Sequence, residues 1–386
     1  MSYKTERKLF SPYKLGPLAL EHRLVMPPLT RLRADADDSP SEIMVQHYDQ
    51  RASKGGLIII EAASVSNKGI GYQGSPGIYD DRHIPGFRRI GEAVHAKGGV
   101  VFAQIIHTGR TSHVALQPNG ESPVAPSTVA YGGHAFLGGE FVPVSPAREI
   151  TVAEIREVVE DFRKAAERAL AAGLDGVEIH SANGYLLDQF LQDGSNHRTD
   201  EYGGSVENRA RFLLEVTKAV VSVWGPGRVG VRIGPSGTFN EMHDSNPEAI
   251  FGYVAEQLNG LDLAYLHVIE PRIAGDVTKE NAEDDAVVAS KFLRKIYKGT
   301  ILAAGGFNGE SAEEILVKGD ADLVAIGRMF TSNPDLPNRL KNGYPLADYD
   351  RSAFWGGTER SYTDFLPYEA EAAFVESESA MALSGD

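Results

Sequence analysis

The sequence predicts an α/β protein folded as a single (β/α)8 TIM barrel. Eight short apolar runs recur along the chain, and longer amphipathic stretches separate them. No second set of repeats follows, and a length of 386 residues fits one barrel with added loops. The same alternation of strands and helices occurs in doubly wound open sheets, which are the alternative fold.

The apolar runs have the length and composition of buried parallel strands. In chain order they are Arg23–Leu29, Gly56–Ala62, Gly99–Ile106, Gly176–His180, Arg228–Gly234, Leu263–Ile269, Thr300–Ala304 and Ala321–Ile326. In a barrel of this kind, functional side chains come from the C-terminal ends of the strands and from the loops that follow. The residues at those ends are therefore the first candidates for a functional site.

Helical periodicity fills the intervals between the runs. The clearest helix begins at Thr151, because Thr151 and Glu154 have the spacing of a capping box. Apolar residues then recur at helical spacing, and Gly173 ends the pattern. Similar helices are expected in Ser41–Lys54, Gly86–Lys97, Val206–Trp224, Pro247–Leu258 and Ser311–Lys318.

Three segments depart from this alternation. Residues 107–150, after the third run, form an extended excursion rich in Gly, Pro and Ser, and loops of this length usually carry function or small structures of their own. Residues 193–211 carry many charges, which indicates mainly a solvated loop and helix start. Residues 369–386 are acidic and aperiodic, which predicts a disordered tail after a barrel domain spanning residues 1–368.

Composition narrows the functional class. The formal net charge of −15 argues against nucleic acid as a partner and, more weakly, against anionic membranes. The absence of cysteine excludes disulfides and thiolate catalysis, and the eleven histidines show no recognisable metal spacing. The polar N-terminus and the lack of any long apolar run lead us to expect a soluble cytoplasmic enzyme, a monomer or homodimer, acting on small molecules.

His180, Asn183 and Tyr185 follow the fourth run. His180 ends the run and Asn183 lies about one helical turn further on, so both can direct hydrogen-bond donors at one point. Two such donors suit the polarisation of a carbonyl or nitro oxygen. Tyr185 adds a phenol, with an unperturbed pKa of ~10, that can donate a proton. A capped helix start would explain any one of the three, but the triplet at a strand end favours a catalytic function.

Two polar residues lie inside apolar runs. Arg232 stands between Val231 and Ile233, and a buried cation there requires an anion. That anion is either a structural carboxylate or a bound cofactor that gains negative charge. Gln104 in the third run must also find partners, and its amide matches the edge of an imide-like ring.

Glycines follow the last two runs. Gly305 and Gly306 follow the seventh run, and Gly327 and Arg328 follow the eighth run. Glycines allow backbone N–H groups to approach a phosphate, and the arginine adds charge. The two loops therefore predict a phosphate site.

A glycine-rich segment elsewhere has a different interpretation. Gly69–Gly74 has the spelling of a dinucleotide-binding fingerprint, but it does not follow its strand directly and no helix opens after it. We therefore expect a loop, with Tyr72 lining the pocket.

Three longer motifs resemble those of the Old Yellow Enzyme family. They are Met26–Arg31 (MPPLTR), His180–Phe190 (HSANGYLLDQF) and Tyr202–Arg209 (YGGSVENR), and the similarity extends from about Lys8 to Pro367. The resemblance implies a barrel that holds FMN non-covalently at its mouth, with NADPH or NADH as the reductant. By position, the flavin would contact Pro27, Pro28, Leu29, Thr30, Ala62, Gln104 and Arg232, and its phosphate would contact Gly305, Gly306, Gly327 and Arg328.

The resemblance also implies a ping-pong reaction at one shared pocket. NAD(P)H would deliver hydride to flavin N5 and leave, and an α,β-unsaturated carbonyl or nitroalkene would then bind to His180 and Asn183. Flavin N5 would pass hydride to the β-carbon of the substrate while Tyr185 protonates the α-carbon. A shared pocket explains why no separate nucleotide-binding unit is needed.

Two positions depart from the family pattern. Ile106 stands where the family usually has tryptophan, and Trp355 stands where the family has tyrosine before two glycines. Both residues are expected to line the substrate pocket, so the substrate range does not carry over from the family.

The sequence leaves three alternatives to alkene reduction open. The same reduced flavin could act on nitrate esters or nitroaromatic compounds, since His180 and Asn183 suit a nitro group. A sugar-phosphate isomerase or aldolase would use the same phosphate loops, with Glu61 as the obvious carboxylate. A flavin-binding redox sensor without turnover is the third alternative, although storage of flavin needs none of the triplet.

Overall fold

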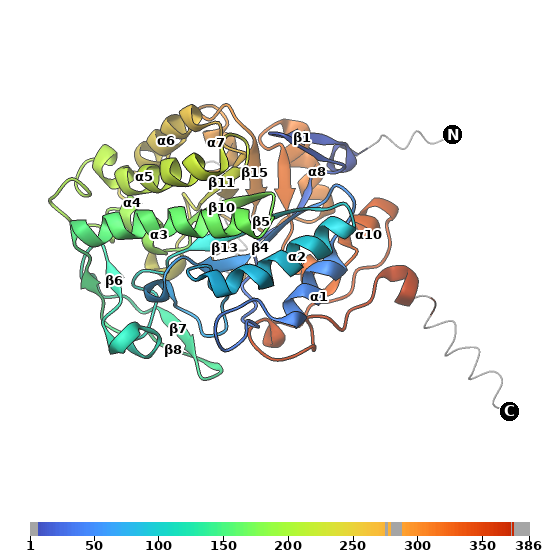
Figure 1. Cartoon of the computed structure of the whole chain (residues 1–386). Helices are drawn as coiled ribbons and strands as arrows, with labels where there is room; N and C mark the ends of the chain where they lie inside the picture. Colours follow the sequence, from blue (N-terminus) through green and yellow to red (C-terminus); the bar gives the residue numbers. More distant parts are fainter. Residues whose placement is uncertain (1–6, 275–276, 279–287, 372, 374–386) are drawn as a thin grey trace.

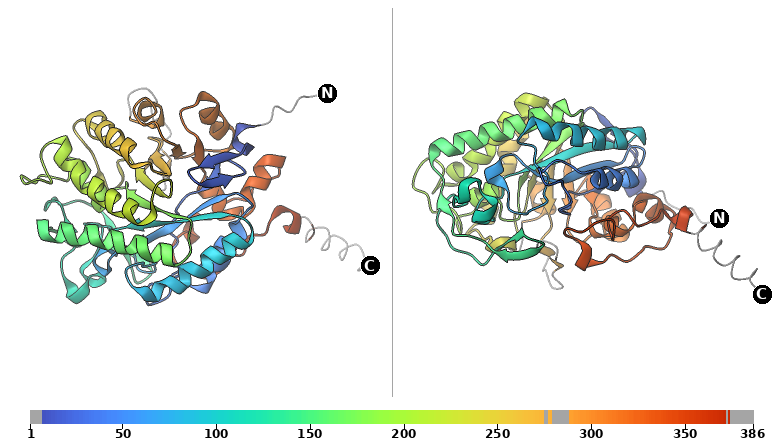
Figure 2. Two further views of the ribbon diagram at one scale, coloured as in Figure 1. Left: turned by 45° about the horizontal axis from the view of Figure 1, so that its top comes forward. Right: turned by 60° about the horizontal axis from the view of Figure 1, so that its bottom comes forward.

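The structure, a computed structural model, describes residues 7–274, 277–278, 288–371 and 373. Its centre is a closed barrel in which every neighbouring pair of strands is parallel. The prediction of a TIM barrel is therefore confirmed over the open sheet, because the last strand, β16, pairs with the first, β3. Figures 1 and 2 show helices surrounding these strands.

Each of the eight apolar runs overlaps one barrel strand. In chain order the strands are β3 (Leu24–Met26), β4 (Leu57–Ser64), β5 (Val100–Ile106), β10 (Gly176–Ser181), β11 (Val229–Ile233), β12 (Tyr265–Ile269), β15 (Ile301–Ala304) and β16 (Leu323–Ala325). An antiparallel hairpin precedes them, formed by β1 (Tyr13–Leu15) and β2 (Leu18–Leu20). Leu15 and Leu20 of this hairpin pack with inward-facing residues such as Leu57 and Phe102, and so close the N-terminal end of the barrel.

Helices surround the strands, and the six longest of the described helices follow the predicted periodicity, whereas the shorter ones were not predicted. The helices are α1 (Glu42–Arg51), α2 (Ile84–Ala96), α3 (Val152–Ala171), α4 (Leu186–Leu191), α5 (Val206–Trp224), α6 (Pro247–Leu258), α7 (Ser290–Leu293), α8 (Gly309–Lys318), α9 (Arg328–Ser332) and α10 (Leu336–Asn342). The capping box of α3 is formed, since Thr151 and Glu154 exchange both expected hydrogen bonds. Helices α2, α3 and α5 pack side by side along the barrel (Figure 1).

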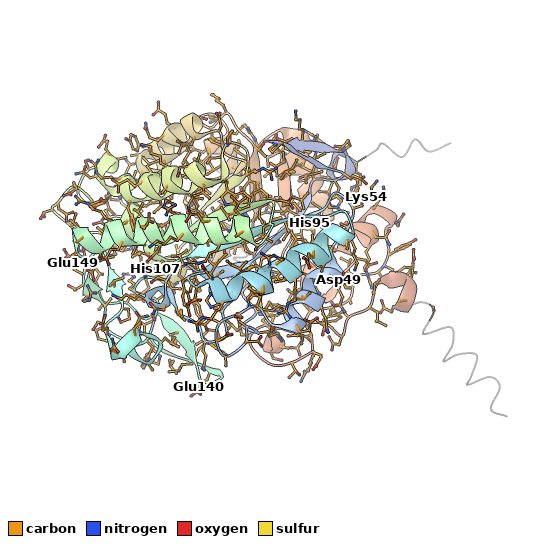
Figure 3. The ribbon with its side chains drawn as sticks, in the orientation of Figure 1. Asp49, Lys54, His95, His107, Glu140 and Glu149 are labelled. Atoms are coloured by element: carbon orange, nitrogen blue, oxygen red, sulfur yellow. The ribbon has the colours of Figure 1, made fainter. Side chains whose placement is uncertain are left out.

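Charged side chains of the outer surface are exposed, in contrast to the barrel interior. Asp49, Lys54 and His95 lie on the outside of the first two βα units (Figure 3). Two of them form surface ion pairs, Lys54 with Glu21 and Asp49 with Lys97. Exposed pairs of this kind contribute only about 0–1 kcal/mol each. Burial of the apolar core therefore dominates the stability of the fold.

The excursion at residues 107–150 carries small sheets of its own. Strands β7 (His134–Leu137) and β8 (Glu140–Pro143) form a hairpin, and β6 (Val124–Ala125) pairs with β9 (Arg148–Glu149). Figure 1 shows these strands together, away from the outer helices α5 and α6. The prediction that the excursion would carry structure is confirmed.

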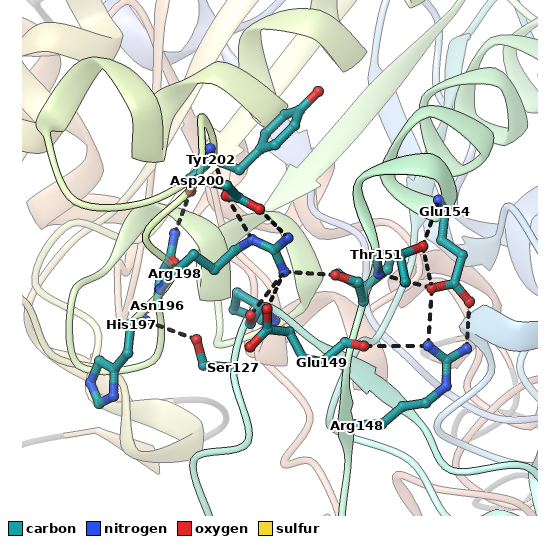
Figure 4. A network of polar contacts seen from close by, with 12 residues as sticks. Ser127, Arg148, Glu149, Thr151, Glu154, Asn196, His197, Arg198, Asp200 and Tyr202 are labelled. Carbon is teal, nitrogen blue, oxygen red and sulfur yellow. Dashed lines mark hydrogen bonds and ion pairs between the residues drawn. The ribbon is translucent and has the colours of Figure 1, made fainter.

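Arg198 attaches the excursion to the barrel, and for this residue the prediction of a mainly solvated loop and helix start at residues 193–211 was wrong. Its guanidinium donates to the carbonyls of Pro126 and Ile150, at 3.1 and 2.7 Å, and forms ion pairs with Glu149 and Asp200 (Figure 4). Arg198 is only 6% exposed. Its positive charge is buried because carboxylates and carbonyls from distant parts of the chain compensate it.

The segment after α10 has little regular structure, and two arginines hold it. Arg31 and Arg33, just after β3, donate to backbone carbonyls of this segment, including those of Phe354 and Thr358. Residues 368–371 are helical, and Glu371 forms an ion pair with Arg339. The rest of the expected tail, residues 372 and 374–386, lies outside the described residues.

Within the described part of the chain, no helix is long and apolar enough to span a membrane. In the same residues, no group of three or more His, Asp or Glu side chains is arranged to hold a metal ion.

Candidate active site

The C-terminal ends of the barrel strands surround a cavity of about 1020 Å³. A smaller cavity of about 70 Å³ adjoins it and shares several lining residues. A volume of this size is sufficient for a large cofactor together with a small substrate. Of the residues predicted from the sequence, the larger cavity is lined by Pro27, Pro28, Leu29, Thr30, Tyr72, Asn183, Tyr185, Arg232, Gly305, Gly306, Gly327, Arg328 and Trp355. The smaller cavity adds Ala62, Gln104, Ile106 and His180.

Strand β10 delivers His180 to the cavity, and a tight turn then presents Asn183 and Tyr185. Asn183 and Gly184 both have left-handed backbone angles, with φ of 59° and 72°. The rings of His180 and Tyr185 meet edge to face, with centroids 5.0 Å apart. The three residues therefore converge on the same part of the cavity, as their spacing predicted.

Burial keeps these groups in their neutral forms. It raises the pKa of Tyr185, with an opposing effect of the hydrogen bond to Tyr72, and it holds the pKa of His180 well below its usual value. The hydroxyl oxygens of Tyr72 and Tyr185 are 3.0 Å apart. The neutral phenol of Tyr185, which lies beside the neutral imidazole of His180, can donate a proton to a bound substrate. It is not an ionised base that would remove one.

The turn that carries Asn183 is fixed on both sides. Asp188 accepts the Gly184 N–H at 2.8 Å, and Gln189 donates to the Gly184 carbonyl at 2.7 Å. Asn240 donates to the Asn183 carbonyl at 2.8 Å. A Cβ at Gly184 would lie 2.7 Å from the Cβ of Asn240, so only glycine fits this left-handed position.

Asp188 gives a testable pH dependence. Burial raises the pKa of Asp188 from its ordinary 3.8 to about 7, because the hydrogen bonds from Gln192 and Gly184 only partly offset it. Its contribution to stability is therefore fully present below pH ~4 and is lost as the pH rises through about 7. We expect Asp188→Asn, which stays neutral, to show a smaller loss of unfolding free energy between pH 5 and pH 8 than the wild type.

From pH 3.8 to about 7 the loss is at most roughly 4 kcal/mol, and between pH 5 and about 7 it is at most roughly 3 kcal/mol. Urea unfolding of both proteins at the two pH values measures it. Parallel pH profiles for the two proteins would contradict the assignment of a raised pKa to Asp188.

Two buried nitrogen atoms at the cavity have no hydrogen-bond partner among the residues that the structure describes. They are Nε of Arg232 and Nδ1 of His180. Buried donors and acceptors nearly always find a partner, so two unpartnered atoms beside one cavity indicate a missing polar ligand. Burial lowers the pKa of Arg232, but a guanidinium remains charged at neutral pH, so the ligand that suits it is an anion or a polarised carbonyl.

A cluster of three buried polar side chains lies beneath this part of the cavity. Gln104 donates from Nε2 to Glu178 at 2.7 Å, and the other carboxylate oxygen of Glu178 lies 2.8 Å from Nδ1 of His267. Neither Glu178 nor His267 is exposed to solvent. The pattern of the sequence did not single out these two residues, although both are polar residues within apolar strand runs.

Glycine loops form another wall of the cavity. Gly305 and Gly306 have φ of 125° and 66°, and a Cβ at Gly305 would lie 3.1 Å from that of Glu270. A Cβ at Gly327 would lie 3.0 Å from Cδ2 of Leu29. Both loops line the cavity together with Arg328, so their backbone N–H groups can approach a bound phosphate.

Glu61 is positioned for a structural role. Its carboxylate accepts the backbone N–H groups of Arg31 and Leu32, at 3.0 and 3.3 Å, and it lines neither cavity. It therefore fixes the loop that carries Thr30 into the site. The carboxylate expected by the isomerase or aldolase alternative is not available to a substrate.

Of the roof of the cavity, sequence reasoning predicted Trp355 and missed the other residues. The lining also includes His134 and Phe141 of the β7–β8 hairpin, the turn Phe239–Glu241, and Phe354. The rings of Phe141 and Trp355 meet edge to face at 5.1 Å. The length of the excursion signalled function, but no spacing indicated which of its residues reach the mouth of the barrel.

Comparison with known proteins agrees with this geometry. The NADH:flavin oxidoreductase / NADH oxidase family matches residues 8–347. Flavin oxidoreductase hxnT of Emericella nidulans is 43% identical over 378 residues, covering 92% of this chain and 97% of its own length. For 12-oxophytodienoate reductase 2 of Arabidopsis thaliana, identity is 42% over 367 residues, with 94% and 96% covered.

Solved structures show the same fold at a similar level of identity. Morphinone reductase has a TM-score of 0.88 at 43% identity, covering 95% of this chain and 98% of its own. The old yellow enzyme homologue from Zymomonas mobilis has a TM-score of 0.88 at 40% identity, covering 93% and 99%. The chain therefore belongs to the NADH:flavin oxidoreductase / NADH oxidase family, the Old Yellow Enzymes that its motifs resemble, and is an NAD(P)H-dependent flavin oxidoreductase.

Proposed function

We propose that this enzyme reduces the C=C bond of α,β-unsaturated carbonyl compounds or nitroalkenes, using NADH or NADPH and non-covalently bound FMN. The observation that carries the proposal is the convergence of His180, Asn183 and a neutral, buried Tyr185 on one cavity. This arrangement supplies two groups for binding an oxygen and one proton donor beside them.

The residues at the cavity fit FMN. The unpartnered Nε of Arg232 suits the carbonyl edge of a flavin, and Gln104 offers an amide to the pyrimidine edge. Thr30 and the preceding prolines line the same side of the cavity, while the glycine loops with Arg328 suit the phosphate. When bound, FMN would supply two-electron transfer between NAD(P)H and the substrate.

The protein side chains would then do three things. His180 and Asn183 hold the carbonyl or nitro oxygen and draw electron density toward it, which activates the conjugated double bond. Tyr185 donates a proton to the α-carbon. The aromatic rings of Phe141 and Trp355 line the cavity and add apolar surface for a substrate.

Reduction of nitrate esters or nitroaromatic compounds is the second candidate. It is supported by the same donors, because His180 and Asn183 can bind a nitro group as well as a carbonyl group. Protonation of the α-carbon by Tyr185 is needed only for alkene reduction. Product analysis with one enone and one nitrate ester at equal concentration separates the two activities.

A visible spectrum of the purified protein tests the proposal directly. We expect a flavin band that bleaches on anaerobic addition of NADPH or NADH and returns when 2-cyclohexenone is added. A colourless protein that cannot be reconstituted with FMN would overturn the proposal. A band that bleaches but does not return with the enone would refute alkene reduction alone.

Ile106 gives a prediction about substrate size. Its side chain lines the smaller cavity together with Ala62 and Tyr72, so a tryptophan there would fill space next to Tyr185. We expect Ile106→Trp to lower kcat/KM for bulky enones at least several-fold. The kcat/KM for small enones should stay unchanged. Steady-state kinetics on 2-cyclohexenone and a ring-substituted analogue measure the change, and an unaltered ratio would refute the role of Ile106.

A further inference from the structure

The interior of the barrel changes from apolar to polar just beneath the active site. Near the N-terminal end, inward-facing side chains such as Leu57, Phe102 and Leu302 form an apolar cluster. One layer higher, the strand register brings Gln104 beside Glu178, and Arg232 beside His267. The polar layer therefore lies between the apolar core and the cavity.

Glu178 is the centre of this layer. One carboxylate oxygen accepts from Gln104 Nε2 at 2.7 Å, and the other lies 2.8 Å from His267 Nδ1. Because an ionised carboxylate can only accept, His267 carries its proton on Nδ1 and Gln104 turns its nitrogen toward Glu178. Although burial alone raises the pKa of Glu178, the nearby His267 and Arg232 hold that pKa below its usual value. Glu178 is therefore a buried anion.

A buried carboxylate of this kind is not explained by the stability of the barrel. Removing a carboxylate from water costs several kcal/mol, and well-packed apolar residues are often as stable or more stable at such positions. The apolar layer directly below shows that this barrel can be packed without polar groups. The position of Glu178 beneath two cofactor-site residues points instead to an effect on the cofactor.

We propose that Glu178 is a positioning residue of the flavin site that also makes the bound flavin harder to reduce. It holds the Gln104 amide in one orientation, and it places a fixed negative charge behind Arg232. This inference rests on the proposed placement of FMN against Gln104 and Arg232.

Two physical effects connect Glu178 to the cofactor. The hydrogen bond to Glu178 prevents the Gln104 amide from rotating, so its remaining donor and acceptor meet the flavin edge in a fixed pattern. If the bound flavin takes up two electrons with fewer than two protons, it gains negative charge beside Arg232. The charge of Glu178 opposes that addition, and it does so effectively because the layer excludes water.

Glu178→Gln and Glu178→Asp separate these effects. Gln keeps the size of the side chain but removes the charge, so we expect the flavin midpoint potential of the holoenzyme to rise. A rise of about 30 mV corresponds to a tenfold change in the ratio of FMN dissociation constants for the oxidised and reduced forms. Asp keeps the charge but withdraws the carboxylate from Gln104, so the potential should change less while the dissociation constant of oxidised FMN rises.

Glu215→Gln is the matched control. Glu215 lies on the outer helix α5 and accepts from Tyr202 at 3.0 Å, so its loss should alter neither the potential nor FMN binding. The potential is measured by equilibrium titration against a reference dye, and FMN binding by fluorescence of the flavin. Circular dichroism of each apoprotein shows whether the variant is folded.

Each outcome bears on the proposal. An unchanged potential in a folded Glu178→Gln enzyme would overturn the effect of the charge, and unchanged FMN binding in Glu178→Asp would overturn the positioning role. If Glu178→Gln does not fold, the Asp variant still decides the positioning role. A wild-type protein that binds no FMN would refute the proposed function itself, which distinguishes the two failures.

Discussion

Replacing Tyr185 by phenylalanine should slow alkene reduction by about 10²–10⁴-fold, the usual contribution of a positioned proton donor. Reduction of the enzyme by NAD(P)H should keep its rate, because no proton from Tyr185 is needed in that half of the reaction. The change removes one hydroxyl group whose neighbour, the Tyr72 hydroxyl, lies 3.0 Å away. Anaerobic stopped-flow absorbance follows the two half-reactions separately.

Tyr72→Phe is the control for this experiment. It removes the other hydroxyl of the pair and leaves both aromatic rings, which meet edge to face at 6.3 Å. We expect a much smaller loss of alkene reduction, because Tyr72 would only orient the hydroxyl of Tyr185. Equal slowing of both half-reactions in Tyr185→Phe would refute the role of Tyr185 as the proton donor, as would a larger effect of Tyr72→Phe.

The barrel was predictable because its signal is local. A buried parallel strand appears in the sequence as a short apolar run, and a covering helix as an apolar stripe of period 3.6. Two helices, Val206–Trp224 and Pro247–Leu258, have the predicted bounds, because Ser205 and Asn246 cap their first turns. Eight alternating units favoured a closed barrel over an open sheet, and the pairing of β16 with β3 shows the closure.

Much of the site was predictable for a related reason. Residues at strand ends share one mouth whatever the intervening loops do, so His180, Arg232 and Gly305 meet although they are far apart in the sequence. The roof could not be predicted in this way. Phe141 reaches the cavity from a hairpin, and Glu241 from a turn with a φ of 58°, and neither position follows from strand spacing.

The buried charges were the main difficulty. Arg198 looked like part of a solvated segment, yet its carbonyl partners at Pro126 and Ile150 are 72 and 48 residues away. Glu178 and Gln104 are separated by 74 residues. Whether a charged side chain is buried depends on the groups that compensate its charge. Groups that lie this far apart in the sequence leave no local pattern in it.

Replacing Arg232 by methionine should lower the affinity for FMN by about 10–100-fold. A hydrogen bond to a charged group is worth roughly 1.5–3 kcal/mol, and 1.4 kcal/mol corresponds to a factor of ten in affinity. In the described part of the chain, Nε of Arg232 has no hydrogen-bond partner, so its binding capacity is free for a ligand. Equilibrium binding of FMN to the apoprotein, measured by flavin fluorescence, tests this expectation.

Arg232→Met should also destabilise the apoprotein, because it leaves the negative charge of Glu178 without a nearby cation. The double variant Arg232→Met/Glu178→Gln removes both charges and should recover stability, but it should not recover FMN affinity. A coupling of more than about 0.5 kcal/mol in this double-mutant cycle would show that the two charges interact in the folded protein. If the double variant regained FMN affinity as well, the loss in Arg232→Met would reflect misfolding of the site, and Arg232 would not be the group that binds the flavin.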